Sequence, residues 1–257
     1  MMAGEEGLAG VRVLVTGGTS GLGLAMARAL AGAGATVAIT GRTAESVGGS
    51  AEAIGGATGF VADVRDQASV TGLVDAVWDA FGGLDMVVNN AGLGMKTVNP
   101  DFMTQPKGFW EVPVDGFRAV IETNLTGYFL VAREVTPRML DAGHGRIVNI
   151  SMNHSTMNRK GFVPYGPSRA GAEALSRIMA ADLADTPVRV NMLLPGGATR
   201  TGMLPSGMEL PASTQLLDPE VMAGPVVWLA SKEAEDVHDE RIIATGFEAW
   251  RRQHLNR

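Results

Sequence analysis

Tyr165 and Arg169 are the residues whose types and spacing point most directly to acid/base chemistry. They stand four positions apart, so on a helix their side chains lie on one face. A guanidinium beside a phenol stabilises the phenolate, the form that a tyrosine must reach to exchange a proton near neutral pH. Because an arginine is never deprotonated in a protein, the pair predicts a fixed positive charge next to a proton-transferring hydroxyl.

A glycine-rich turn after an apolar strand is a second candidate site. The turn consists of Thr16, Gly17, Gly18, Thr19, Ser20, Gly21, Leu22 and Gly23. Gly17 allows the chain to turn sharply, Gly21 lets backbone N–H groups approach a pyrophosphate, and Gly23 lets the following helix pack closely. The helix N-terminus adds free donors and partial positive charge. No Gly-Lys-Ser/Thr sequence follows, so the turn predicts a dinucleotide site rather than a P-loop.

Short apolar runs alternate with segments of helical period along the whole chain. Strands are expected near 11–16, 35–40, 58–62, 84–88, 145–150, 188–193 and 240–244. Helices are expected near 21–33, 43–54, 67–81, 114–141, 165–184 and 219–230. Because several strands are apolar on both faces, the pattern predicts an α/β fold. We expect a doubly wound (Rossmann) parallel sheet of about seven strands with helices on both faces, forming a single domain over 1–257.

The composition limits the class of protein. A chain of 257 residues that is 46% hydrophobic can bury one substantial core. Its net charge of −6 argues against nucleic-acid binding, and the absence of cysteine excludes disulfides and thiol chemistry. No apolar run approaches the roughly 18 residues of a membrane helix, and the first residues lack a signal-peptide pattern. We therefore expect a cytoplasmic protein that binds neither membranes nor nucleic acid.

Two segments interrupt the alternation and follow predicted strand ends. Residues 93–113 and 196–218 are rich in Gly, Pro and Met. Parallel sheets bind ligands at the carboxyl ends of their strands, so we expect both segments on the substrate side. Their methionines, among them Met95, Met103, Met203 and Met208, favour an adaptable apolar pocket.

Taken in order, the motifs resemble those of the short-chain dehydrogenase/reductase family over nearly the whole chain. They are the turn 16–23, Asp63-Val64, Asn89-Asn90-Ala91-Gly92, Asn124 before Leu125, the strand 145–151, Tyr165 with Arg169, and Pro195-Gly196. The resemblance implies an NAD(P)-dependent oxidoreductase that interconverts a carbonyl and a secondary alcohol. The cofactor would carry the hydride, and the protein would position the cofactor and the substrate and polarise the reacting group. It also implies a homodimer or homotetramer and a small, partly apolar substrate.

The resemblance also assigns roles to individual residues. Asp63 and Val64 would contact the adenine, Thr199 or Thr201 the nicotinamide carboxamide, and Asn124 would hold a water in a proton relay. Tyr165 would exchange the proton with the substrate oxygen, and Arg169 would hold the nicotinamide ribose. The cofactor-binding set is Thr16, Gly17, Thr19, Ser20, Gly21, Leu22, Gly23, Arg42, Asp63, Val64, Asn90, Ala91, Gly92, Tyr165, Arg169, Pro195, Gly196 and Thr199.

The end of the second strand favours NADP over NAD. Gly41 stands where members of the family that prefer NAD carry an aspartate, so no acid is present to bind a ribose 2′-hydroxyl. Arg42 follows and is suited to pair with a 2′-phosphate. The alternative is that Arg42 is only a solvated charge. No metal is expected, because the four histidines show no ligand spacing.

Two departures from the family pattern bear on catalysis. The usual lysine four residues after the tyrosine is Arg169, which can supply charge and donors but cannot shuttle a proton. At the position where the family usually carries its catalytic serine, this chain has Met152. Of the nearby hydroxyls, Ser151 is the first candidate for its role and Ser155 the second; Thr156 is also close in sequence. These departures leave two alternatives open: a non-redox lyase or dehydratase on the same fold, and a cofactor-binding protein with a decayed active site.

Overall fold

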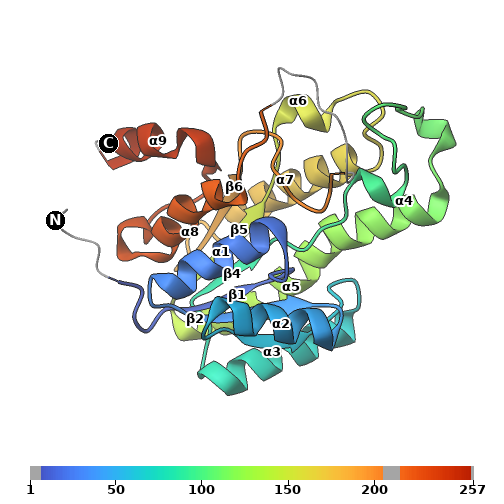
Figure 1. The fold of residues 1–257 in the computed structure, drawn as a ribbon. Coiled ribbons are helices and arrows are strands. Elements are labelled where there is room, and N and C mark those ends of the chain that lie inside the picture. The colour runs from blue at the N-terminus through green and yellow to red at the C-terminus, as the bar shows by residue number, and fades with distance from the viewer. Residues whose placement is uncertain (1–6, 205–214, 256–257) are drawn as a thin grey trace.

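The computed structural model describes residues 7–204 and 215–255, and in these a seven-stranded parallel sheet lies between two layers of helices (Figure 1). The strands are β1 (Arg12–Val15), β2 (Thr36–Gly41), β3 (Thr58–Val61), β4 (Met86–Asn89), β5 (Gly145–Ile150), β6 (Val188–Leu194) and β7 (Arg241–Ile243). Their order is β3-β2-β1-β4-β5-β6-β7, and every neighbouring pair is parallel. The sequence prediction of a doubly wound parallel sheet is therefore confirmed.

The main helices are α1 (Gly21–Gly32), α2 (Ala44–Ile54), α3 (Gln67–Phe81), α4 (Val114–Ile121), α5 (Gly127–Ala142), α6 (His154–Met157), α7 (Tyr165–Asp182), α8 (Ala223–Ala230) and α9 (Phe247–Leu255). Apart from α6 and α9, they lie in the segments that the sequence predicts to be helical. Local signals set their ends: Asp66 caps α3 by accepting from the Ser69 N–H at 2.7 Å, and Gly82 ends it in the left-handed conformation. No helix within the described ranges is long and apolar enough to span a membrane.

Three differences from the predicted elements were found. The predicted helix 114–141 is two helices, because the π-helical segment Glu122–Thr126 separates α4 from α5. The predicted helix 219–230 begins as the 3₁₀ turn Pro219–Met222 before α8. The short α6 and the terminal α9 were not predicted at all.

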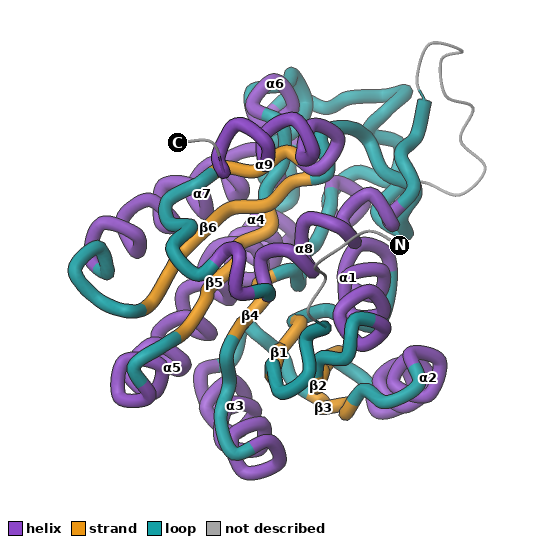
Figure 2. Tube along the Cα trace, turned by 90° about the vertical axis from the view of Figure 1, so that its left-hand side faces the viewer, coloured by secondary structure: helices purple, strands orange, loops and turns teal. Residues whose placement is uncertain are grey.

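The central strands β1, β4, β5 and β6 are buried on both faces, and alternate residues belong to different cores. Val13 and Val15 of β1 belong to the core that α1, α8 and α9 cover, whereas Leu14 belongs to the core that α3, α5 and α7 cover. Figure 2, which is turned by 90° from Figure 1, shows α1, α2 and α8 on one side of the strands and α3, α5 and α7 on the other. The central strands are thus fixed by packing on both sides, and their carboxyl ends form a rigid edge.

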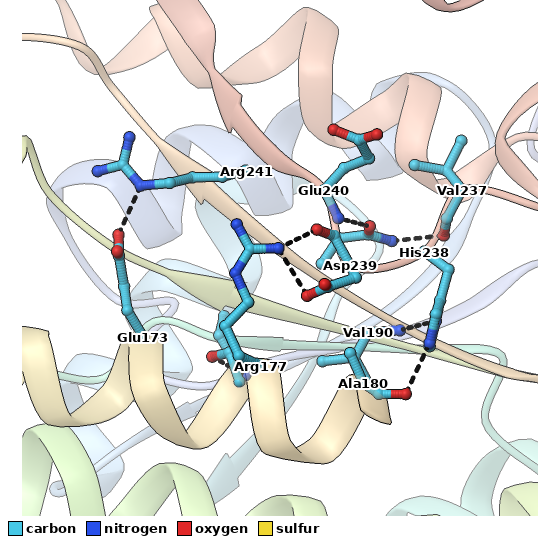
Figure 3. Close-up of polar contacts among 12 residues, drawn as sticks. Glu173, Arg177, Ala180, Val190, Val237, His238, Asp239, Glu240 and Arg241 are labelled. Carbon is cyan, nitrogen blue, oxygen red and sulfur yellow. Dashed lines mark hydrogen bonds and ion pairs between the residues drawn. The ribbon is translucent and has the colours of Figure 1, made fainter. Parts of the chain in front are cut away.

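Polar contacts hold the last strand on its neighbours (Figure 3). His238 accepts from the Val190 N–H at 3.2 Å through Nδ1, and its Nε2 lies 2.8 Å from the Ala180 carbonyl of α7. Arg177 of α7 forms an ion pair with Asp239 at 2.6 Å. Together these contacts fix the approach to β7, and Arg241 at its start reaches Glu173 of α7 at 2.8 Å.

Candidate active site

A cavity of about 630 Å³ runs along the carboxyl ends of the strands. The segments that follow six strands contribute to its wall, through Gly17, Arg42, Asp63, Asn90, Ser151 and Pro195. Parallel α/β sheets bind ligands at this edge. The sheet order thus brings together residues as far apart in the sequence as Gly17 and Pro195.

Most of the residues predicted for the site lie on this wall. They are Gly17, Thr19, Ser20, Gly21, Leu22, Arg42, Asp63, Val64, Asn90, Ala91, Gly92, Ser151, Tyr165, Arg169, Pro195, Gly196 and Thr199. Thr16, Gly23 and Asn124 do not line the cavity and lie behind it. Their contacts, described below, position the wall rather than form it.

The glycine turn is held in shape by the loop after β4. Asn90 donates through Nδ2 to the carbonyl oxygens of Thr16 and Gly17, each at 3.0 Å, and Thr16 Oγ1 accepts from the backbone of Asn90 and Ala91. Gly17 has φ +63°, and a Cβ there would lie 2.8 Å from Ala91 Cα. A Cβ on Gly23 would lie 2.3 Å from the Gly17 carbonyl oxygen, so any larger residue would displace the turn.

The first turn of α1 presents a cradle of the kind that phosphates occupy. Gly21, with φ +52°, begins the helix on the cavity wall. Within the described residues Ser20, at the N-cap, makes no side-chain bond to the helix, so the first N–H groups are not capped by their own chain. The steric space, the helix dipole and these donors fit the pyrophosphate of a dinucleotide.

Charged side chains gather at the end of the cavity that lies beside β2 and β3. Arg65 binds the Asp63 carboxylate through Nε and Nη2, at 2.9 and 2.5 Å. This pairing, with a smaller contribution from Arg42, holds the pKa of Asp63 below its ordinary value. A Cβ on Gly41 would lie 2.7 Å from the methyl group of Thr19, so an acid at 41 would require side chains to move.

Tyr165 and Arg169 lie together at the start of α7, as their spacing predicts. The Arg169 guanidinium carbon is 5.4 Å from the centroid of the Tyr165 ring. Nη1 donates to the Tyr128 hydroxyl at 2.6 Å and to the Ile150 carbonyl at 2.9 Å. Arg169 is only 3% exposed, and its Nε has no hydrogen-bond partner in the described part of the chain.

The surroundings of Arg169 keep it charged and fix its place. Burial opposes the charge, but the attraction of Tyr128 and Tyr165 outweighs it, so the pKa of Arg169 lies above its ordinary value. A Cβ on Gly92 would lie 2.5 Å from Nη2, so this edge of the guanidinium packs directly against backbone. The unpartnered Nε and the close-packed Nη2 are suited to hydroxyl groups of a bound ribose.

Asn124 lies in the π-helical segment and is fully buried. Its Oδ1 accepts from the Leu93 N–H at 2.8 Å, and its Nδ2 donates to the Leu93 carbonyl and to Ser168 Oγ at 2.9 and 3.0 Å. The side chain therefore joins the loop after β4 to α7. Its role in holding a relay water remains a prediction.

The serine candidates differ in their surroundings. Ser151 lies on the cavity wall but donates its hydroxyl hydrogen to the carboxylate of Glu173. Ser155 is exposed and does not line the cavity. Met152 and Thr156 also line it, so a further hydroxyl stands on the wall close to Met152.

Glu173 is the centre of a polar cluster that sequence reasoning missed. Besides Ser151, it accepts from Arg241 Nε at 2.8 Å and contacts His154 Nε2 at 3.0 Å. Burial alone would raise its pKa, but hydrogen bonds from these three residues outweigh burial and hold the pKa below its ordinary value. Arg241 also donates to the Met152 carbonyl at 2.7 Å. The cluster thus ties α6, α7 and β7 to the segment after β5.

Replacing Glu173 by glutamine should destabilise the fold at pH 7 by about 1–3 kcal/mol, because Arg241 loses a buried charged partner. A carboxylate with a lowered pKa stabilises the fold above its unfolded-state pKa of about 4.3 and loses that effect as pH falls through the folded-state value. The difference from wild type in urea unfolding should therefore shrink between pH 7 and acidic pH. The exposed Glu52→Gln variant is the control, and an equal difference at both pH values would contradict the assignment.

The other end of the cavity is apolar. Its wall includes Met95, Phe102, Met103, Phe162 and Leu204, so residues of 93–113 and of 196–204 both contribute. The part of the predicted segment 196–218 at 205–214, which includes Met208, lies outside the described residues. Arg159 stands on this wall with its guanidinium carbon 4.9 Å from the Phe162 ring centroid. Among the residues described, no group of three or more His, Asp or Glu side chains is placed to hold a metal.

Comparisons with known proteins agree with this arrangement. The family profile described as short chain dehydrogenase matches residues 11–209. A 2,5-dichloro-2,5-cyclohexadiene-1,4-diol dehydrogenase of Sphingobium indicum is 33% identical over 239 residues, which cover 89% of this chain and 92% of the relative. A 3-oxoacyl-[acyl-carrier-protein] reductase of Vibrio cholerae is 32% identical over 252 residues, covering 93% and 97%.

A solved structure shows the same architecture. The 3-ketoacyl-(acyl-carrier-protein) reductase from Brucella melitensis, complexed with NADH, is 27% identical and superposes with a TM-score of 0.81. The match covers 92% of this chain and 97% of that one. The glycine turn and the Tyr165–Arg169 pair on the cavity wall agree with these matches. The profile match and the relatives show that the chain belongs to the short-chain dehydrogenase/reductase family and is an NAD(P)-dependent oxidoreductase.

Proposed function

We propose that this chain is an NADP(H)-dependent oxidoreductase that interconverts a carbonyl and a secondary alcohol. One observation carries the proposal: the glycine turn, Arg42 and the Tyr165–Arg169 pair lie along a single cavity at the sheet edge. The first two features fit the phosphates of a dinucleotide, and the pair fits proton transfer at the far end. The apolar wall beyond the pair leaves room for a substrate.

The preference for NADP rests on the charges beside β2 and β3. Arg42 lies on the cavity wall, and Asp63, the one acid among the described residues of this wall, is already paired with Arg65. Space at Gly41 is filled by neighbouring side chains. A 2′-phosphate would therefore meet an available guanidinium here, while a 2′-hydroxyl would find no free carboxylate.

In catalysis the bound dinucleotide supplies or accepts the hydride. Tyr165 donates its hydroxyl proton to the substrate oxygen during reduction and takes a proton back during oxidation. Arg169 stabilises the negative charge on the phenolate oxygen and would help to hold the ribose, with Nε as the donor for which the described residues supply no acceptor. Because Arg169 keeps its proton, the proton that Tyr165 loses must be replaced through solvent rather than through position 169.

Ser151 is the proposed second contact of the substrate oxygen, since Ser155 is off the wall. While Ser151 donates to Glu173, only its lone pairs are free, so it can accept a hydrogen bond from a substrate alcohol. A carbonyl substrate needs a donor, and the Ser151 hydroxyl hydrogen must then turn away from Glu173. This orientation favours the alcohol-bound state.

The proposed substrate has an apolar body and an acidic group. The apolar wall fits the body, and Arg159 is a cation with no acidic partner among the described residues. We also propose a homodimer or homotetramer, since Phe129 of α5 and Ile178 of α7 are 44% and 59% exposed on helices that the family resemblance pairs between subunits. A cytoplasmic location is part of the same proposal.

Calorimetric titration with NADPH and NADH tests the proposal first. If Arg42 binds the 2′-phosphate by a charge-assisted bond, NADPH should bind about 10- to 100-fold more tightly than NADH. Equal affinities would overturn the NADP preference. Binding of neither dinucleotide would overturn the proposed function itself.

A further inference from the structure

We propose that Tyr128 is a positioning residue that holds Arg169 in the orientation in which it serves the active site. The inference rests on the proposed function, because it concerns the contact of Arg169 with the cofactor and with Tyr165. Tyr128 is the second residue of α5 and is only 1% exposed. It does not line the cavity, so it acts through Arg169 and does not touch substrate or cofactor.

The geometry joins the only two tyrosines of the chain through one guanidinium. The Arg169 guanidinium carbon is 5.6 Å from the Tyr128 ring centroid and 5.4 Å from that of Tyr165. Both distances allow cation–π attraction. Tyr128 Oη accepts from Arg169 Nη1 at 2.6 Å and lies 3.3 Å from the Ile150 carbonyl, to which it donates. The hydroxyl of Tyr128 is thus used both as acceptor and as donor.

A buried guanidinium needs fixed acceptors. Within the described part of the chain Nη1 of Arg169 binds two acceptors, the Tyr128 hydroxyl and the Ile150 carbonyl, and Tyr165 is a further hydrogen-bond partner of the guanidinium. Without Tyr128 Oη, Nη1 would keep only the Ile150 carbonyl as an acceptor, and the rotation of the guanidinium would be less firmly fixed. Nη2, which packs against Gly92, and the unpartnered Nε would then lose their aim toward a bound ribose.

Burial keeps the Tyr128 hydroxyl suited to this role. Desolvation raises the pKa of Tyr128, and the opposing attraction of Arg169 is smaller, so the hydroxyl stays neutral at physiological pH. A neutral hydroxyl can accept from Arg169 and donate to Ile150 at the same time, whereas a phenylalanine could do neither. Tyr128 and Arg169 therefore form a unit: the arginine at 169 relies on an oxygen supplied from α5.

A double-mutant cycle between Tyr128→Phe and Arg169→Met tests the inference, with the NADPH dissociation constant as a readout that needs no turnover. Tyr128→Phe alone should weaken NADPH binding and lower kcat, each by about tenfold, with the KM for the carbonyl substrate unchanged. In the Arg169→Met background the same change should have no further effect on NADPH binding. Thermal unfolding of both proteins shows that the fold is retained.

The outcomes separate the inference from the function on which it rests. Additive effects of the two substitutions on NADPH affinity, or a Tyr128→Phe variant with wild-type affinity and kcat, would overturn the positioning role alone. A wild-type chain with no affinity for either dinucleotide would overturn the proposed function and this inference together.

Discussion

Replacing Tyr165 by phenylalanine is expected to lower kcat by about a thousandfold, the usual size of a general acid/base contribution. The substitution removes the hydroxyl that exchanges a proton with the substrate oxygen but keeps the ring that packs over Arg169. Affinity for NADPH should therefore stay within a few-fold of wild type. Steady-state kinetics with saturating cofactor and a separate NADPH titration would measure the two effects.

The other tyrosine provides the matched comparison for this variant. Tyr128→Phe also removes one phenolic oxygen beside Arg169, yet it should lower kcat only about tenfold, because Tyr128 does not reach the reacting atoms. Equal losses in the two variants would contradict the separate roles given to the two hydroxyls. Activity of Tyr165→Phe within a few-fold of wild type would remove Tyr165 from the mechanism.

Replacing Arg42 by alanine should weaken NADPH binding by about 10- to 100-fold and leave NADH binding nearly unchanged. The physical reason is that only NADPH carries the 2′-phosphate, and Arg42 stands on the wall where that phosphate would lie. The affinities of both cofactors for the variant should consequently become similar. Parallel calorimetric titrations would give the change in preference directly.

Arg118→Ala is a suitable control for Arg42, since Arg118 is exposed on α4 and does not line the cavity. It removes the same charge from the chain and should alter neither affinity. A loss of NADPH and NADH affinity in equal proportion would indicate that Arg42 supports the adenine or the fold. An unchanged NADPH affinity would assign the phosphate to another group.

The fold could be predicted because its signals are local. Apolar runs such as Val13 to Val15 and helix-period segments such as 67–81 alternate along the chain, and alternation of this kind admits essentially one arrangement of parallel strands. The π-helical break at 122–126 could not be predicted in this way. It depends on Asn124 reaching the backbone of Leu93, a contact 31 residues away in the sequence.

The terminal helix α9 had a signal that was not used. Phe247, Trp250 and His254 recur at helical spacing and pack beside Trp228 of α8, with the Trp228 and Phe247 rings 5.6 Å apart. The packing partner, Trp228, lies in a different helix and could not be inferred from the segment alone.

The site was predictable as far as its residues follow strand ends, because the carboxyl ends of parallel strands share one edge. The Glu173 cluster could not be predicted, since Arg241 is 68 residues away from Glu173 and reaches it only through the position of β7. Glu173 lies one helical turn beyond Arg169, so its position on the helix, though not its partners, could be predicted from the sequence. The partner of Arg169 in α5 had one signal: Tyr128 is the only tyrosine of the chain besides Tyr165.

Two alternatives to the proposed function were left open by the sequence: a non-redox lyase or dehydratase, and a cofactor-binding protein with a decayed active site. They arise because the sequence pattern places Arg169 and Met152 at the positions where the family usually carries a lysine and a serine. Arg169 is buried, the described residues offer its Nε no acceptor, and a buried guanidinium is costly unless bound groups complete its hydrogen bonds. This supports a site that still binds a ligand at Arg169. The second contact of the substrate oxygen is where the site differs most from the family pattern. Glu173 holds the hydroxyl of Ser151, and Met152 lies beside it on the wall.

Turnover of NADPH with matched carbonyl compounds tests the central claim most directly. The substrates are apolar ketones in pairs that differ only in a carboxylate, with NADPH absorbance followed and products identified by chromatography. The account predicts that NADPH is consumed in step with alcohol formed, faster for the acid of each pair because Arg159 stands on the wall. Substrate consumed without change in nicotinamide absorbance, or NADPH bound with no ketone reduced, would contradict it.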